Sequence, residues 1–478
     1  MEGLRMDDLR RYNRFLGTMC GLAGLMYGID LGLIAAALPY IKATCSYTPA
    51  QLSSIVAAVL LGAIPGSFVA AQVSERWGRL AAFKLTAVVF AVAVPLICLS
   101  NGSFVLMMTG RLLQGAGCAL VGLSAPLYMA ECSPPESRGR GTGMIQLILT
   151  VGLVVAALVG WAVTWFFGPA ESAEVSLAAK GMAWQSIFWF SMIPAFFLFF
   201  GSFRLTESPR WLFRKGRREE ARASLAAGNP PEACARILAE MEANEAASTV
   251  TAADGRTVKD SLLQRKYVLP FALAFAILCL TQATGVNSVL NYSVDLMHKA
   301  GLAGSLANVS DTVIKLVNFA MTIVALGLVD RRGRKFLLSL GTAGVVVGLA
   351  AVGFTFLAIE RGWLGAGPLA GWLATGGFVL FIAAYGVGPG VCVWLALSEL
   401  MPTRIRANGM MIAGYGNAAT SWAIAQSFLP WSAAWGESGV FFTLAAVAVL
   451  FFLVAAFVLP ETKGRSLEEI ERYFAKRK

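Results

Sequence analysis

The 478-residue sequence has few charged residues. Asp, Glu, Lys and Arg together make up 14% of it, against about 25% in ordinary soluble domains. Hydrophobic residues make up 57%. A chain with so little charge and so many apolar side chains is not a water-soluble globular protein. The composition therefore predicts an integral membrane protein.

Histidine is almost missing, because His298 is the single one in the chain. The sequence also has no His and Cys cluster with the spacing of a metal site, no Gly-rich phosphate loop and no recognisable pair of nucleophile and base. We therefore expect no metal, no cofactor and no enzymatic activity. We expect His298 to be solvated at the outer end of a membrane span.

The eight cysteines are not arranged for disulfide bonds. Seven fall in predicted spans or on the side of the membrane that holds the N-terminus, and only Cys45 is expected on the opposite side. Disulfides form in oxidising compartments, so this distribution excludes a disulfide framework. A cleavable signal peptide is not expected either, because the apolar run after Arg14 is too long for one.

Twelve apolar runs are long enough to cross a bilayer, which takes about 20 helical residues. They lie near 15–41, 49–73, 80–100, 103–132, 139–167, 183–205, 265–298, 306–329, 336–359, 367–401, 404–430 and 436–459. The one extended polar stretch, 206–264, is predicted to be a helical linker on the cytoplasmic side. We divide the chain into an N-terminal half (1–205), this linker, a C-terminal half (265–459) and a cytoplasmic tail (460–478).

The net charge of +11 would suggest a nucleic-acid ligand in a soluble protein, but here its distribution predicts orientation. With the N-terminus placed in the cytoplasm, only four Lys or Arg fall outside, and two, Arg111 and Lys315, fall well inside spans rather than at their cytoplasmic ends. Because cytoplasmic loops accumulate positive charge, we expect both termini in the cytoplasm and no nucleic-acid partner.

Three charged motifs occur twice, once in each half. Glu131 closes an apolar run and Arg138 opens the next one, as Glu399 and Arg406 do in the second half. The other two motif pairs are 75–79 with 330–334, and 207–210 with 461–465. Repeats in register indicate an architecture built twice. We interpret the following as gating ion pairs at the cytoplasmic surface, against the alternative of ordinary loop charge: Glu75, Arg79, Glu131, Arg138, Glu207, Asp330, Arg334, Glu399, Arg406 and Glu461.

A carboxylate, Asp30, lies halfway along the first predicted span, and Arg111 lies in the glycine-rich fourth span. A charge inside the membrane costs at least about 2.5 kcal/mol, so it normally faces a partner or a water-filled cavity. We predict that Asp30 and Arg111 face one cavity and couple transport to protons. The alternative is a purely structural carboxylate.

Several spans carry amide or aromatic side chains in their middle. Gln282, Asn287 and Tyr292 lie in span seven around Gly285, and span ten has glycines and a proline before Trp394. Glycine and proline predict loosened helices, which transporters use to present polar groups to a substrate. With Gln146 and Asn417 in other spans, these side chains predict a site for a neutral polyhydroxylated ligand. Taken singly, each is explained equally well by contacts between helices.

These motifs resemble the sugar porter branch of the major facilitator superfamily, over residues 15 to 470. The resemblance is carried by the segments 75–79, 126–139, 207–212, 282–287, 330–334 and 460–464. It implies an all-α integral membrane protein with twelve transmembrane helices in two six-helix bundles, plus cytoplasmic helices. It implies sugar contacts from Gln146, Gln282, Asn287, Trp394 and Asn417, and proton coupling through Asp30 and Arg111. It also implies that the cytoplasmic ion pairs hold the outward-facing state.

The function expected is proton-coupled symport of a monosaccharide across the cytoplasmic membrane by a monomer in the lipid bilayer. An uncoupled sugar or polyol facilitator is the alternative, and a non-transporting sugar sensor is a more remote one. The sequence departs from the family pattern at Thr281, Asn291, Leu153, Val391 and Ala418. These departures leave the identity of the sugar open. Lys315 is a further residue that the resemblance does not explain.

Overall fold

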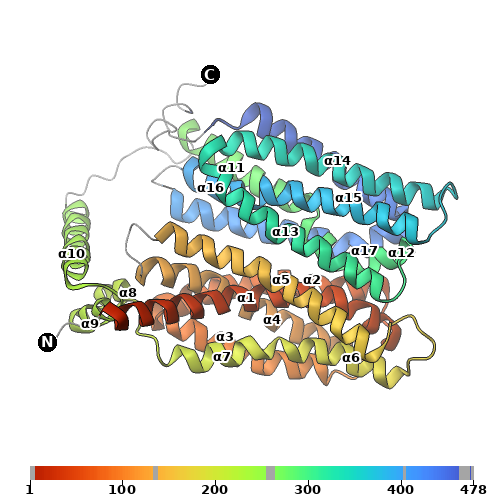
Figure 1. Ribbon diagram of the computed structural model, residues 1–478. Helices are drawn as coiled ribbons and strands as arrows, with labels where there is room; N and C mark the ends of the chain where they lie inside the picture. The colour runs from red at the N-terminus through yellow and green to blue at the C-terminus, as the bar shows by residue number, and fades with distance from the viewer. Residues whose placement is uncertain (1–5, 133–137, 254–263, 402–404, 462–473, 475–478) are drawn as a thin grey trace.

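The computed structural model describes residues 6–132, 138–253, 264–401, 405–461 and 474 (Figure 1). Within these residues the regular structure is helical throughout, and no strand is found in them. The helices run side by side as a bundle (Figure 1).

The first half of the chain forms six spans from seven helices. Five spans are single helices, and the sixth consists of two short helices that follow one another across Ser191. The bounds are α1 Met6–Thr44, α2 Pro49–Trp77, α3 Arg79–Cys98, α4 Phe104–Cys132, α5 Arg138–Phe167, α6 Leu177–Phe190 and α7 Met192–Ser202.

The second half of the chain also forms six spans. The bounds are α11 Arg265–Ala283, α12 Val286–Lys299, α13 Ser305–Arg332, α14 Arg334–Glu360, α15 Pro368–Val387, α16 Pro389–Leu400, α17 Arg406–Leu453 and the π-helix Val454–Val458. Eleven stretches are long and apolar enough to cross a membrane. The α17 stretch contains two spans, joined where Gly436 has φ 73° and ψ 167°. The predicted twelve spans are therefore present.

Local sequence explains where helices begin and break. Thr48 starts α2 through a capping box with Gln51, and Pro49 occupies the first turn, where its missing N–H costs nothing.

Span seven breaks at Gly285, which is left-handed with φ 80°, and span ten breaks at Gly388, between α15 and α16. Both breaks confirm the predicted loosening of these spans.

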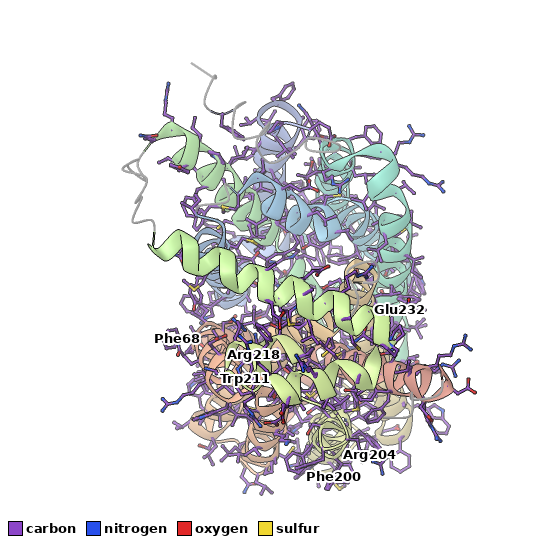
Figure 2. The ribbon with its side chains drawn as sticks, turned by 90° about the vertical axis from the view of Figure 1, so that its left-hand side faces the viewer. Phe68, Phe200, Arg204, Trp211, Arg218 and Glu232 are labelled. Carbon is purple, nitrogen blue, oxygen red and sulfur yellow. The ribbon has the colours of Figure 1, made fainter. Side chains whose placement is uncertain are left out.

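Three helices connect the halves: α8 Pro209–Arg214, α9 Arg218–Gly228 and α10 Pro231–Ala253. They lie at the end of the bundle where α1 begins (Figure 1). We call this the linker end and the opposite one the far end. Figure 2 looks onto the linker end and shows α10 running across it. Trp211 anchors α8, because its indole N–H donates to the Glu75 carbonyl at 2.9 Å.

The two halves are joined at the far end. The Tyr292 hydroxyl donates to the Ala425 carbonyl at 3.2 Å and approaches the Ser53 hydroxyl at 3.4 Å, which brings α2 against α12 and α17. Asn308 of α13 donates to Thr164 of α5 at 3.1 Å, and Lys42 of α1 pairs with Asp295 of α12. These bonds close the far end of the bundle.

Candidate functional site

A cavity of about 300 Å³ lies between the two halves. This is the volume of the smaller sites that hold organic ligands. All the polar side chains that line it, among the residues described, are uncharged. They are Tyr27, Gln146 and Thr150 from the first half and Gln282, Asn287, Asn291, Asn318, Thr322, Tyr385, Trp394, Asn417 and Ser421 from the second. The arrangement suits a small, neutral, hydrogen-bonding ligand.

The centre of the site is a fixed group of three side chains at the break of span seven. The Asn287 amide nitrogen donates to the Gln282 side-chain oxygen at 2.9 Å and to the Ser421 hydroxyl at 2.7 Å. The loosened backbone at Gly285 places Gln282, from the end of α11, beside Asn287 at the start of α12. These bonds hold the side chains in place before a ligand arrives, which reduces the entropy lost on binding.

Of the four other predicted contact residues, three line the cavity and one lies in the core. Gln146, Trp394 and Asn417 line the cavity as expected. The side-chain oxygen of Asn417 is buried and has no hydrogen-bond partner among the described residues, so it is placed to accept a bond from a ligand hydroxyl. Tyr292 does not line the cavity. It is fully buried and stacked on Phe428, with ring centroids 4.8 Å apart.

Tyr292 is therefore corrected from a ligand contact to a part of the far-end closure. The residue that precedes it, Asn291, lines the cavity instead. Neighbouring residues of a helix point about 100° apart, so an error of one position exchanges the cavity face for the core face.

Besides Asn291, sequence reasoning missed six polar residues of the cavity: Tyr27, Thr150, Asn318, Thr322, Tyr385 and Ser421. Asn318 and Thr322 lie four residues apart on α13, so they occupy one face of the helix. That spacing is a signal in the sequence. Ser421 follows Asn417 at the same spacing in α17, and Thr150 follows Gln146 in α5.

Asp30 and Arg111 are buried within the first half and are not among the residues that line the cavity. One Asp30 oxygen accepts a bond from the Cys118 thiol at 3.3 Å, and the other is buried without a partner among the described residues. Arg111 donates to the Gln114 side chain at 2.9 Å and lies over the Phe188 ring. The two charges interact electrostatically, but no direct ion pair within 4 Å joins them in the part of the chain described.

The prediction that Asp30 and Arg111 face the cavity is therefore wrong for this conformation. Tyr27, one helical turn before Asp30, lines the cavity instead. Asp30 lies beside Cys118 of α4 instead, in the interior of the first half.

At the linker end, the first half has a buried ion-pair cluster. Arg79 binds Glu131 through two bonds of 2.7 Å, in the bidentate geometry of guanidinium and carboxylate. Glu207 accepts bonds from the backbone N–H groups of Arg79 and Leu80 at 2.9 and 3.1 Å, so it caps the N-terminus of α3. Glu75 lies 3.7 Å from Arg79.

The second half repeats this arrangement. Arg334 pairs with Glu399 at 3.0 Å. Glu461 accepts from the backbone N–H groups of Arg334 and Lys335 at 3.1 and 3.2 Å. The duplicated motifs therefore form equivalent contacts around equivalent helix starts.

Each cap depends on a glycine directly before the helix. Gly78 has φ 100° and Gly333 has φ 87°, a region that favours glycine. A Cβ at these positions would lie 2.2 Å from Glu207 and 2.6 Å from Glu461 respectively. Only glycine allows the capping carboxylate to approach.

Three predicted gating residues, Arg138, Asp330 and Arg406, have side chains outside the described residues. The ion pairs seen for Arg79 and Arg334 each join residues of the same half. Glu75 additionally lies 3.4 Å from Arg214 of α8. The linker-end pairs that the structure describes thus hold each half together.

Two ion pairs at the far end, Lys42 with Asp295 and His298 with Glu171, join opposite halves, and sequence reasoning missed them. His298 binds Glu171 at 2.7 Å, so the expectation of a solvated histidine is wrong. Partial burial raises the pKa of Glu171, but the hydrogen bond and charge of His298 outweigh this effect and hold that pKa below its usual range. The partners are 127 positions apart in the sequence, and no local pattern connects them.

Comparison with known proteins gives the same architecture. The model of the family described as "Sugar (and other) transporter" matches residues 16–474. The chain belongs to this sugar transporter family. It is 30% identical to the probable metabolite transport protein CsbC of Bacillus subtilis, over 98% of this chain and 96% of that protein. It is 29% identical to the galactose-proton symporter of Escherichia coli, over 98% of both chains.

Solved structures show the fold. The partially occluded inward-open structure of the xylose transporter XylE from E. coli matches with a TM-score of 0.79 at 20% identity, covering 95% of this chain and all of that one. This sugar transporter family member therefore has the twelve-helix major facilitator fold. It is a transporter rather than an enzyme, and a multi-pass protein of the plasma membrane.

Proposed function

We propose that the protein carries a monosaccharide together with a proton across the cytoplasmic membrane by alternating access. The observation that carries this proposal is the fixed Asn287, Gln282 and Ser421 group in a cavity to whose wall the described residues contribute no charged side chain. A site built from neutral donors and acceptors discriminates strongly in favour of a hydroxylated ligand, because its buried groups stay unpaired with an apolar one. The galactose-proton symporter among the relatives supports the same class of cargo.

We propose that the linker end faces the cytoplasm, so that both termini and α8–α10 are cytoplasmic. Positive charges in short loops favour this orientation. The far-end closure then makes the described conformation inward-facing. The linker-end pairs across the two halves, including Arg138 and Arg406, are proposed to form when the protein turns outward.

Proton coupling is assigned to Asp30. It is a buried carboxylate with one oxygen unpartnered in the described chain and an arginine, Arg111, within electrostatic range. Burial favours its neutral form and Arg111 favours its charged form. A proton that binds one conformation better than the other shifts the balance between them. Tyr27, three residues before Asp30 on α1, lines the cavity.

The test is counterflow of labelled sugars by the purified protein in proteoliposomes, with and without an imposed pH gradient. A hexose, a pentose and a polyol should be compared in parallel. We expect one monosaccharide to exchange without a gradient and to accumulate with one. No exchange of any sugar would contradict the proposed cargo.

Uncoupled facilitation is the second candidate, and one observation favours it. Asp30 is sealed from the cavity in this conformation, bound to Cys118, as a structural carboxylate would be. A facilitator exchanges sugar but shows no accumulation under a pH gradient. The proteoliposome experiment therefore separates the two functions. The protein is proposed to work as a monomer, since the cavity is complete within one chain.

A further inference from the structure

A second pair of charges is buried in the membrane region of α13. The Lys315 ammonium lies 2.7 Å from Asp311, one helical turn earlier, and neither side chain is more than 1% exposed. The Ser293 hydroxyl of α12 donates to the other Asp311 oxygen at 2.5 Å. Neither Lys315 nor Asp311 lines the cavity. Ionisable groups inside a membrane protein are retained where they have a role in its mechanism.

Lys315 also reaches the opposite half. Its ammonium donates to the Gly32 carbonyl of α1 at 3.4 Å. Gly32 follows Asp30 by two residues, and its Cα packs against Ala156 and Leu153 of α5 closely enough that a Cβ would lie 2.6 Å from the Ala156 methyl. The segment of α1 that carries the proposed proton site is thus held between α5 of its own half and Lys315 of the other.

The bond lies at the far-end edge of the cavity. Leu31, beside Gly32, lines the cavity, and so does Asn318, about one turn after Lys315. Beyond this level the halves are joined by Tyr292 and by Lys42. Alternating access requires the halves to separate here, because the cavity must open to the far side.

We propose that Lys315 is a positioning residue of the transport cycle, which holds the Asp30 segment of α1 against the second half in the far-end-closed state only. Asp311 and Ser293 hold the ammonium in place. When the far end opens, the bond to Gly32 is lost, but Lys315 and Asp311 stay together because both belong to α13. The contact between halves is therefore reversible without leaving a buried charge unpaired.

The role proposed for Lys315 rests on the proposed alternating access. It differs from a purely structural role in its effect on the ratio of the two conformations. A pair that only stabilises the second half supports both conformations equally and does not change their ratio. A bond present in one conformation shifts the ratio toward that conformation.

The test compares the wild type with the double variant Asp311→Asn/Lys315→Met, which removes both charges together. Thr312→Val is the matched control, because the hydrogen bond of the Thr312 hydroxyl within the described structure is to the Asn308 carbonyl of its own helix, at 2.8 Å. Hydrogen–deuterium exchange of the sugar-free proteins in nanodiscs reports the opening of the far end. We expect faster exchange in the far-end parts of α1, α12 and α13, and a shift of the conformational ratio by roughly fivefold to tenfold.

Counterflow provides the second readout. In the double variant, fewer molecules should have an open linker end, so the half-saturating concentration of sugar added on that side should rise. Thr312→Val should keep the wild-type value. Unchanged exchange in a folded double variant would overturn the proposal. Loss of folding in both this variant and Asp311→Asn/Lys315→Gln would also overturn the proposal, because the charged pair would then be needed for folding alone.

Failure of the proposed function would be seen separately. Hydrogen exchange needs no sugar and reports the role of Lys315 even if no tested sugar is carried. Absence of counterflow in the wild type, by contrast, contradicts the cargo and leaves the exchange result unaffected.

Discussion

The two halves share a fold and a set of linker-end motifs but contribute different chemistry to the centre of the molecule. The first half supplies the buried charges Asp30 and Arg111, behind the cavity wall. The second half supplies most of the polar wall, including Asn287, Asn318 and Asn417. Duplication preserved the helices and their caps, while the interiors diverged. Ligand recognition and proton binding are thus expected to be separable by substitution.

The repeated ion pairs differ as well. The side chains of Arg79 and Glu131 are 3% and 10% exposed, whereas those of Arg334 and Glu399 are 14% and 25% exposed. Ser208, just before α8, donates to Glu131 at 2.5 Å and adds to the first cluster. Corresponding ion pairs therefore occupy sites of different burial, and burial decides how much stability is lost when one partner is removed.

The largest effect is expected from Asp30→Asn in the first half. The amide keeps the size and a hydrogen-bonding group but cannot titrate, so accumulation driven by a pH gradient should be lost while counterflow continues. Both are measured in the same vesicles. Cys118→Ser is the control, because a hydroxyl still donates to Asp30, and it should retain accumulation. Accumulation that survives in Asp30→Asn would move coupling to another residue.

Next in size is the difference between Arg79→Gln and Arg334→Gln. Removing Arg79 leaves Glu131 buried without its guanidinium, which should lower the free energy of unfolding by about 3–5 kcal/mol. Removing the more exposed Arg334 should lower the free energy of unfolding by about 1–3 kcal/mol. Thermal unfolding of the two variants in the same detergent gives the comparison. Equal shifts in melting temperature would show that the two sites are equivalent after all.

Asn287→Ala in the second half should weaken sugar binding by about 1–3 kcal/mol, because Gln282 and Ser421 lose the amide that holds them. Gln282→Ala should give a loss in the same range. Coupling should be kept, so the sugar that binds is still accumulated. Thr312→Val is the matched control: it removes a hydroxyl that lies outside the cavity and bonds the Asn308 carbonyl of its own helix, so it should leave the binding constant unchanged. Weaker binding in the control would show that the loss does not report contacts with the sugar.

The smallest effect is expected at Trp394, whose residue surface is 50% exposed. Trp394→Ala should weaken binding by about 0.5–1.5 kcal/mol, the usual value of an aromatic contact, and Trp394→Phe should recover most of it. Titration calorimetry with the transported sugar measures both. An effect in Trp394→Ala that exceeds the loss in Asn287→Ala would place the ligand nearer to α16 than proposed.

The sequence was sufficient for features that depend on neighbouring residues. Hydrophobic length predicted the twelve spans, and the helix breaks at Gly285 and Gly388 followed from glycine and proline chemistry. Features that depend on the rotation of one helix against another were not predictable. Asp30 points away from the cavity and Asn291 replaces Tyr292 in its wall, because mid-helix position does not reveal which face is turned inward.

Pairs between distant segments were missed for the same reason. His298 and Glu171 belong to different halves, and Lys315 meets the Gly32 carbonyl, which has no side chain to mark it. The pairing of Lys315 with Asp311 was within reach, since four residues separate them on one helix. The charge of Asp311 lies near the start of a span and does not stand out from an ordinary loop charge there.

The uncharged cavity wall has an electrical consequence. A neutral sugar in a neutral site adds no charge to the moving parts, so under the proposed mechanism the proton is the one charge carried with the cargo. A membrane potential of 100 mV does about 2.3 kcal/mol of work on each such charge, equivalent to roughly a 50-fold concentration ratio. Sugar uptake would then respond to voltage even with the same pH on both sides.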